Sequence, residues 1–304
     1  TALPAQGLAA RPQPLAWHHE RAGSHVPAGS PIRRILHAAG LVVPEPRHRP
    51  RRAGHRLAAA APNELWQSDV THWRLADTSE VEVCSWLDDH SRYLLGCTAF
   101  GRVDGDDVVA TFCAAGEAHG WPAATLTDDA AVYTSRFTGG HNAFEYLLAY
   151  LGIKQRNGAP GHPQTQGKIE RFHQTLQRWL GQQPAARTIE ELQAQLDAFR
   201  AAYDEARPHR AIGRRTPAEA YRATPKVLPA GPRARSHLRL RYDRTDGNGA
   251  FTLRRAGRMH HLKIGVAHAR RRVLAIVDEH EVTVVDLGTG EVLSTHLIEP
   301  DLGY

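Results

Sequence analysis

The chain has 304 residues, more than one domain usually needs, so two or three structural units are expected. It has no run of about 18 apolar residues and no signal-peptide pattern at its start. These features predict a soluble, cytoplasmic protein. The three cysteines, Cys84, Cys97 and Cys113, form no C-x-x-C pair, which argues against a zinc site and a disulfide framework.

Charge is distributed unevenly along the chain, whose formal net charge is +6. Residues 1–62 hold nine Arg against two acids, and residues 226–304 hold 13 Lys and Arg against nine acids. Residues 63–225 hold 16 Lys and Arg against 21 acids. Basic flanks around a mildly acidic centre suit a protein whose flanks hold a polyanion while its centre holds cations.

Residues 1–41 predict a partial DNA-binding region. Two short helices are expected at 15–22 and 31–39, with Ser30 and Pro31 at the start of the second. They would form the latter part of a helix-turn-helix that offers Arg33 and Arg34 to DNA; the alternative is a basic helical linker. Residues 42–62 are rich in Pro, Arg and His and predict an extended basic linker, with Arg51 and Arg52 along phosphates.

Residues 63–225 alternate strands and helices, as in an α/β catalytic core. Strands are expected at 64–75, 80–87, 93–100, 123–127 and 153–156, and helices at 106–119, 137–151, 167–180 and 188–206, the last with a capping box of Thr188 and Glu191. This order predicts one mixed five-stranded sheet with helices on both faces. A D-D-H-S-R segment at 88–92 is expected to cap the hairpin between the second and third strands, although Asp88 and Asp89 could instead support the site.

The C-terminal part begins after a Pro, Gly and Arg rich linker at 226–236. From 237 to 304 the hydrophobic pattern has period two, and five or six short strands predict a small SH3-like β-barrel that binds DNA. Arg239 and Arg241 alternate with apolar residues, so one side of this domain is expected to be basic.

Three carboxylates are the candidate catalytic and metal-binding residues. Asp69 lies in the first predicted strand, Asp128 follows the fourth, and Glu170 lies on the predicted helix at 167–180. Three carboxylates suit two Mg²⁺ or Mn²⁺ ions that activate phosphodiester bonds, because these ions prefer oxygen ligands. On its helix alone, Glu170 also fits an ordinary surface residue.

Basic residues accompany Glu170 on the same predicted helix. Lys168 and Arg171 flank it, and Arg178 lies farther along the polar face. All three are predicted to contact the DNA backbone, since Lys and Arg side chains position phosphates.

Five ordered motifs now resemble those of bacterial insertion-sequence transposases with a retroviral-integrase-like core. They are P-N-E-L-W-Q-S-D-V-T, L-D-D-H-S-R-Y, T-D-D-A-A-V-Y-T-S-R-F, H-P-Q-T-Q-G-K-I-E-R-F-H-Q-T-L and Y-D-E-A-R-P-H-R-A-I-G-R-R-T-P. The resemblance implies a ribonuclease-H-like fold and a D-D-E triad, carried by motif position onto Asp69, Asp128 and Glu170. It also implies cleavage and strand transfer at transposon ends by an oligomer bound to double-stranded DNA, in the bacterial nucleoid.

One position departs from the family pattern. Where the family usually has D-N-G, this chain has Asp128, Asp129 and Ala130, so an extra carboxylate stands beside the expected metal site. Two alternatives to an active transposase stay open: a ribonuclease-H-like nuclease that cuts without joining, and a catalytically silent DNA-binding protein derived from a transposase.

Overall fold

The computed structural model describes residues 12–40, 58–128, 130–134, 142–157, 167–230, 239–255, 258–278 and 281–297. Arg51, Arg52 and Asp129 lie outside these ranges. By its internal contacts the chain divides into two compact units. One comprises Thr1–Pro62, Val70–Gly101 and Pro160–Lys226, and the other comprises Asn63–Asp69, Arg102–Ala159 and Val227–Tyr304.

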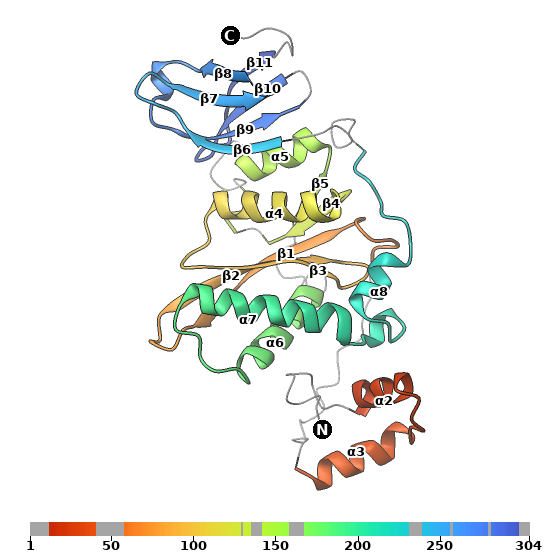
Figure 1. Ribbon diagram of the computed structural model, residues 1–304. Coiled ribbons are helices and arrows are strands. Elements are labelled where there is room, and N and C mark those ends of the chain that lie inside the picture. Colours follow the sequence, from red (N-terminus) through yellow and green to blue (C-terminus); the bar gives the residue numbers. More distant parts are fainter. Residues whose placement is uncertain are drawn as a thin grey trace. The chain divides into compact units, whose positions relative to one another are not determined.

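Figure 1 shows the described helices and strands of both units. The helices are α2 (Pro12–Arg21), α3 (Gly29–Ala38), α4 (Gly105–His119), α5 (Ala143–Leu151), α6 (Gly167–Leu180), α7 (Ile189–Ala201) and α8 (Pro217–Arg222). The strands are β1 (Trp66–Arg74), β2 (Glu80–Asp88), β3 (Leu94–Phe100), β4 (Ala124–Thr127), β5 (Lys154–Asn157), β6 (Arg239–Arg244), β7 (Ala250–Arg255), β8 (Arg258–Lys263), β9 (Arg272–Val277), β10 (Glu281–Asp286) and β11 (Val292–Leu297). Within the described ranges, no helix is long and apolar enough to cross a bilayer.

The predicted mixed five-stranded sheet is confirmed. Its strand order is β3-β2-β1-β4-β5. The β2 and β3 strands pair antiparallel, whereas β4 pairs parallel with both β1 and β5. The predicted order of strands and helices in the core therefore matches the structure. The first residues of the helix predicted at 137–151 lie outside the described ranges, and α5 begins at Ala143.

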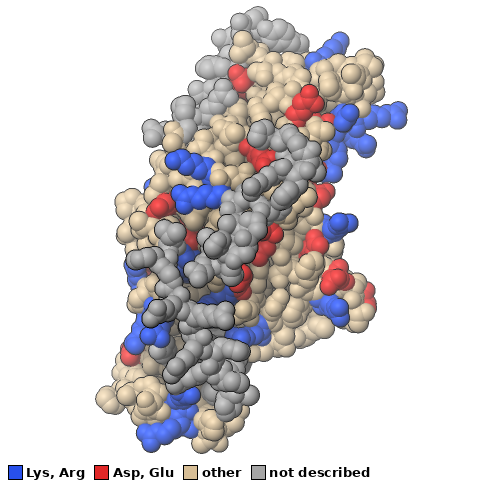
Figure 2. Space-filling model, turned by 180° about the vertical axis from the view of Figure 1, so that it is seen from behind, with Lys and Arg blue, Asp and Glu red and all other residues tan. Residues whose placement is uncertain are grey.

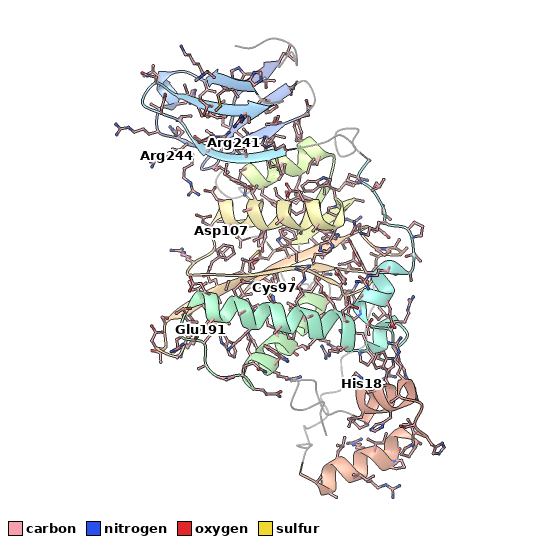
Figure 3. All side chains as sticks on the ribbon, viewed as in Figure 1. His18, Cys97, Asp107, Glu191, Arg241 and Arg244 are labelled. Carbon is pink, nitrogen blue, oxygen red and sulfur yellow. The ribbon has the colours of Figure 1, made fainter. Side chains whose placement is uncertain are left out.

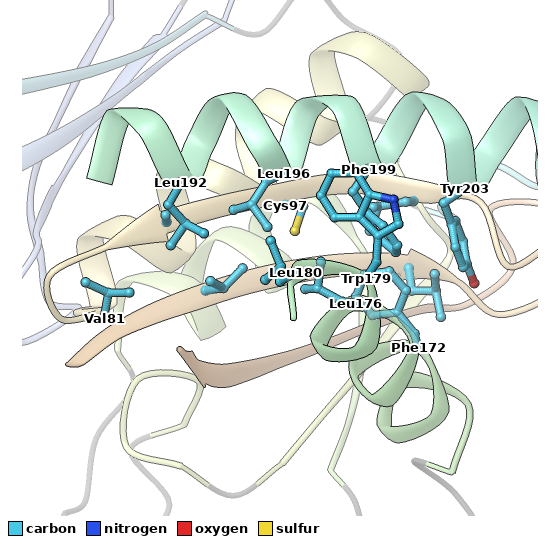
Figure 4. Close-up of a cluster of buried hydrophobic side chains, with 14 of the residues drawn as sticks. Val81, Cys97, Phe172, Leu176, Trp179, Leu180, Leu192, Leu196, Phe199 and Tyr203 are labelled. Atoms are coloured by element: carbon cyan, nitrogen blue, oxygen red, sulfur yellow. The ribbon is translucent and has the colours of Figure 1, made fainter. Parts of the chain in front are cut away.

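In the first unit, α6 and α7 supply half of the buried residues of one hydrophobic core, and β2 and β3 supply most of the others. Ile169, Phe172, Leu176 and Leu180 recur at helical spacing on α6 and are all buried. Figure 4 labels Phe172, Leu176 and Leu180 of α6 together with Leu192, Leu196 and Phe199 of α7, which point toward the strands. The buried face of α6 leaves Glu170, Arg171 and Arg178 exposed on the opposite side, as the spacing predicts.

The start and end of α7 differ from the prediction. The Thr188 side chain accepts a hydrogen bond from the Glu191 amide, but the Glu191 carboxylate accepts from the Arg187 amide at 2.8 Å. The capping box is thus only half formed, because the Arg187 guanidinium also attracts this carboxylate, at 3.0 Å. At the other end the α-helix stops at Ala201 and a π-helical turn, Ala202–Ala206, follows.

The second unit has an aromatic core around the start of β1. The Phe112 ring of α4 lies 5.8 Å from Trp66, 5.5 Å from Trp121 and 5.3 Å from Phe144 of α5, measured between ring centroids. Trp66, Phe112 and Phe144 are at most 1% exposed. This cluster fixes the part of β1 that precedes Asp69.

The described C-terminal strands form two separate sheets. One has the order β11-β10-β9-β6 and the other is the β7-β8 hairpin. Buried Phe251, Leu253 and Leu262 of the hairpin pack with Val273, Ala275, Val277, Val282 and Val284 of the larger sheet. Six short strands agree with the prediction, but a closed SH3-like barrel is not confirmed.

The two N-terminal helices fall close to the predicted ranges. Arg33 and Arg34 are exposed on α3, and only Leu36 of that helix is buried. The Arg21 guanidinium of α2 forms an ion pair with Glu219 of α8, with 2.5 Å between the charged atoms. A helix-turn-helix is not confirmed by these two helices.

Candidate functional site

The second unit places Asp69 and Asp128 next to each other on neighbouring parallel strands. Trp66 pairs with Thr125 and Gln67 with Leu126. Continuing this register by two residues brings Asp69 opposite Asp128, which directly follows β4. Residues opposite each other in parallel strands point to the same face of the sheet, about 4.8 Å apart along the hydrogen-bonding direction. Both carboxylates are half-buried.

The loop after Asp128 is anchored by buried polar contacts. The backbone amide of Ala130, which stands where the family usually has glycine, donates a hydrogen bond to Asp128 Oδ1 at 3.1 Å. Tyr133 is fully buried, and its hydroxyl lies 2.8 Å from the hydroxyl of Ser68, the neighbour of Asp69. Gln155 of β5 donates to the Tyr133 carbonyl at 3.0 Å. These contacts connect the loop to β1 and β5.

The third predicted carboxylate, Glu170, is exposed in the first turn of α6. Among the residues described, no group of three or more His, Cys, Asp and Glu side chains has the spacing of a metal site. The register thus brings together two of the three predicted carboxylates, and the role of Glu170 stays a prediction.

The donor chemistry of Asp69 and Asp128 fits a hard divalent cation. Asp69 lies within β1 and Asp128 directly follows the neighbouring strand β4, and the three cysteines are buried elsewhere in the chain. Oxygen donors of this kind suit Mg²⁺ or Mn²⁺ and disfavour soft metals.

The structure gives Lys168 a partner inside the protein, and its contact with DNA stays a prediction. Its ammonium forms a hydrogen-bonded ion pair with Asp89 Oδ2. The Lys168 side chain is 17% exposed and that of Asp89 is 1% exposed. Burial lowers the pKa of Lys168 below its usual range, against the raising effect of Asp89. Sequence reasoning missed this pair because 79 residues separate the two side chains.

The hairpin turn predicted at 88–92 is present. Asp88 Oδ1 accepts from the Ser91 amide at 2.8 Å and from the Ser91 hydroxyl at 2.6 Å. The Asp88 amide donates to the Tyr93 carbonyl at 2.9 Å. Asp88 therefore closes the turn, whereas the Asp89 side chain contacts Lys168 of α6.

The predicted basic side of the C-terminal domain stays a prediction, and the structure gives its two arginines contacts within the domain. Arg239 and Arg241 pair with Val277 and Ala275, so they share the face that packs against the β7-β8 hairpin. Arg241 forms a 2.6 Å ion pair with Asp243, and Arg239 donates to the Arg254 carbonyl at 2.9 Å. Figure 3 labels Arg241 on this strand. The alternation of side chains between the two faces of β6 was predicted correctly. Which of these faces lies on the side of the β7-β8 hairpin depends on the tertiary fold.

The opposite face of β6 also makes contacts within the second unit. The Tyr242 hydroxyl donates to Cys113 Sγ of α4 at 3.9 Å, and Arg272 of β9 forms an ion pair with Asp106. Burial raises the pKa of Cys113 to about 12, which keeps this thiol protonated. On the face drawn in Figure 2, Lys and Arg side chains are interspersed with Asp and Glu. The uneven charge along the sequence thus gives a mixed surface in this view.

A shallow hollow of about 280 Å³ lies in the first unit. It is lined by His72, Trp73, Arg74, Glu80 and Gln177. Gln177 donates to the Thr71 hydroxyl at 3.0 Å, which joins α6 to β1 there. None of the predicted site residues lines this hollow.

Comparison with known proteins identifies the core. Residues 59–163 and 151–217 match two sequence profiles that are both described as integrase core domain. An uncharacterised protein of insertion element IS476 from Xanthomonas euvesicatoria is 27% identical over 197 residues, 62% of this chain and 54% of that protein. Its counterpart in IS407 from Burkholderia multivorans is 28% identical over 206 residues, 66% of this chain and 71% of that protein. The chain thus spans about half the length of the first relative.

A solved structure of a retroviral assembly is also similar. A chain of the simian T-cell lymphotropic virus intasome in complex with PP2A regulatory subunit B56 gamma aligns over 88% of this chain and 91% of its own length. The TM-score is 0.48 and the sequence identity is 19%.

Proposed function

Since the chain belongs to the bacterial insertion-sequence transposases with a retroviral-integrase-like core, we propose that it cleaves DNA at transposon ends and joins those ends to target DNA. The observation that carries the proposal is the parallel pairing of β1 with β4, whose register brings Asp69, the fourth residue of β1, opposite Asp128, which directly follows β4 at the carboxyl edge of that strand. Ligands of open α/β sheets bind at this edge.

Asp69, Asp128 and Glu170 are proposed to hold two Mg²⁺ or Mn²⁺ ions. When bound, these ions supply Lewis-acid stabilisation to the attacking and leaving oxygens of the phosphodiester. The chain's own contribution is to fix two of the carboxylates on adjacent strands and to hold the Asp128 loop through Tyr133. An oligomer bound to double-stranded transposon ends and target DNA, acting at the nucleoid, is proposed with this activity.

Exposed arginines on α6 supply the proposed DNA contacts near Glu170. Arg171 and Arg178 lie on the same exposed face as Glu170. Arg33 and Arg34 on α3 are also exposed and suit a second phosphate contact. Each phosphate neutralised makes binding more sensitive to salt.

The test is a cleavage and strand-transfer assay with the full chain, the element's own end DNA and Mg²⁺. Glu170→Gln and Asp69→Asn are expected to abolish both products while DNA binding persists. Glu190→Gln is the matched control, because Glu190 is also an exposed acid in the first turn of a helix. It is expected to leave both products unchanged.

The outcomes separate the alternatives. Cleaved DNA without joined product would identify a nuclease. Absence of both products from a folded chain that still binds end DNA would identify a silent DNA-binding protein. In that case Asp129→Asn combined with Ala130→Gly restores the family sequence after Asp128 and tests whether this loop blocks activity.

A further inference from the structure

The Asp89 carboxylate connects three segments of the first unit. It accepts a hydrogen bond from the Ala59 amide at 2.7 Å, where the chain enters the core, and it binds the Lys168 ammonium. The neighbouring His90 Nδ1 lies 2.9 Å from the Ala59 carbonyl. Asp89 is 1% exposed, so its charge is compensated by these contacts and not by water.

The hairpin turn holds Asp89 in place. The Arg92 guanidinium donates to the Asp89 carbonyl, and Arg92 adopts a left-handed conformation with φ of 67°. The Arg92 amide donates to the Asp88 carbonyl at 2.9 Å. A non-glycine residue in this conformation costs energy, so the turn is held by its surrounding contacts.

Lys168 is the second residue of α6 and precedes Glu170 by two positions. The first turn of a helix lacks intrahelical partners for its amides and is the part that frays. An ion pair from this turn to a buried carboxylate restrains it. Arg171 and Arg178 are exposed on the same helix, whereas the Lys168 side chain is mostly buried.

We propose that Lys168 is a positioning residue, whose ion pair with Asp89 fixes the first turn of α6 and thereby sets the orientation of Glu170. The proposal rests on the proposed function of Glu170. It assigns Lys168 a role distinct from phosphate contact, although its charge and its place in the motif suggest DNA binding. Buried ion pairs contribute little net stability, so we assign this pair the role of orienting Glu170 and not that of stabilising the fold.

The first test does not depend on activity. Hydrogen exchange is measured on α6 of the full chain for wild type, Lys168→Met and Asp89→Asn. Amides of residues 171–173, which donate to the carbonyls of the first turn, are expected to exchange at least 10-fold faster in both variants, while those of 176–180 keep their protection. Arg187→Met breaks an exposed ion pair of the same unit and serves as the control, with no change in α6. Unchanged exchange in Lys168→Met overturns the proposal, even if the wild type lacks activity.

The second test separates positioning from DNA contact. Lys168→Met is expected to lower the cleavage turnover by ~10- to 100-fold, since a 1 Å displacement of a catalytic group has effects of this size. Its Kd for end DNA should stay within twofold of wild type at every salt concentration. Arg171→Met should instead weaken binding and reduce the slope of log Kd against log salt by about 0.9.

Combining the variants tests the pair itself. Asp89→Asn should lower turnover as Lys168→Met does, and the double variant should lose no more than the worse single one. Lys168→Arg, which keeps the charge, should recover most of the rate. A lower salt slope in Lys168→Met, with full turnover in Asp89→Asn, would show a phosphate contact and overturn the proposal.

Discussion

Acidification should destabilise the protein through His173, which lies on the buried face of α6. This side chain is 7% exposed, and burial lowers its pKa from 6.5 to about 4. The unfolded chain therefore binds the proton more tightly than the folded chain. Stability that depends on neutral His173 is fully present above pH 6.5 and is lost as the pH falls from 6.5 toward 4.

The size of the effect follows from the two pKa values. A shift of one pKa unit corresponds to about 1.4 kcal/mol, so lowering the pH from 7 to 5 should cost about 2 kcal/mol through this one histidine. The free energy of unfolding is measured by urea titration at several pH values. His173→Leu should reduce the fall in stability by about this amount, because it removes the titrating group.

Gln174→Leu is the matched control for this prediction. Gln174 is the exposed neighbour of His173 on α6, and its substitution introduces the same side chain without removing a titratable group. An equal fall in stability for wild type and His173→Leu would refute the reasoning. So would an NMR titration that places the pKa of folded His173 near 6.5.

Two further predictions concern contacts that hold the site. Leu176→Ala should lose about 2–5 kcal/mol of unfolding free energy in urea, because Leu176 of α6 is fully buried in the core that α6 shares with α7. Gln174→Ala, on the exposed face of α6, should stay within about 0.5 kcal/mol of wild type. Tyr133→Phe should cost about 1 kcal/mol in the same assay, since it removes the buried hydrogen bond to Ser68; a change below the measurement error would show that this contact does not hold the loop after Asp128.

The sequence alone determined the elements of the core and the positions of its carboxylates on them. Period-two and period-3.6 patterns are local properties, so β1 to β5 and α6 could be located from residue spacing. The same reasoning placed Asp69 in β1 and Asp128 at the end of β4, and it separated the buried Leu176 from the exposed Arg178.

Only the tertiary structure decided which charges meet. Lys168 and Arg171 look alike in the sequence, yet Lys168 binds the buried Asp89 while Arg171 is exposed. Likewise, alternation in β6 identified two faces, but only the packing of the β7-β8 hairpin against β9 and β10 showed that Arg239 and Arg241 lie on the same side of their sheet as that hairpin. Ion pairing and burial depend on distances between segments far apart along the chain, and local periodicity does not encode those distances.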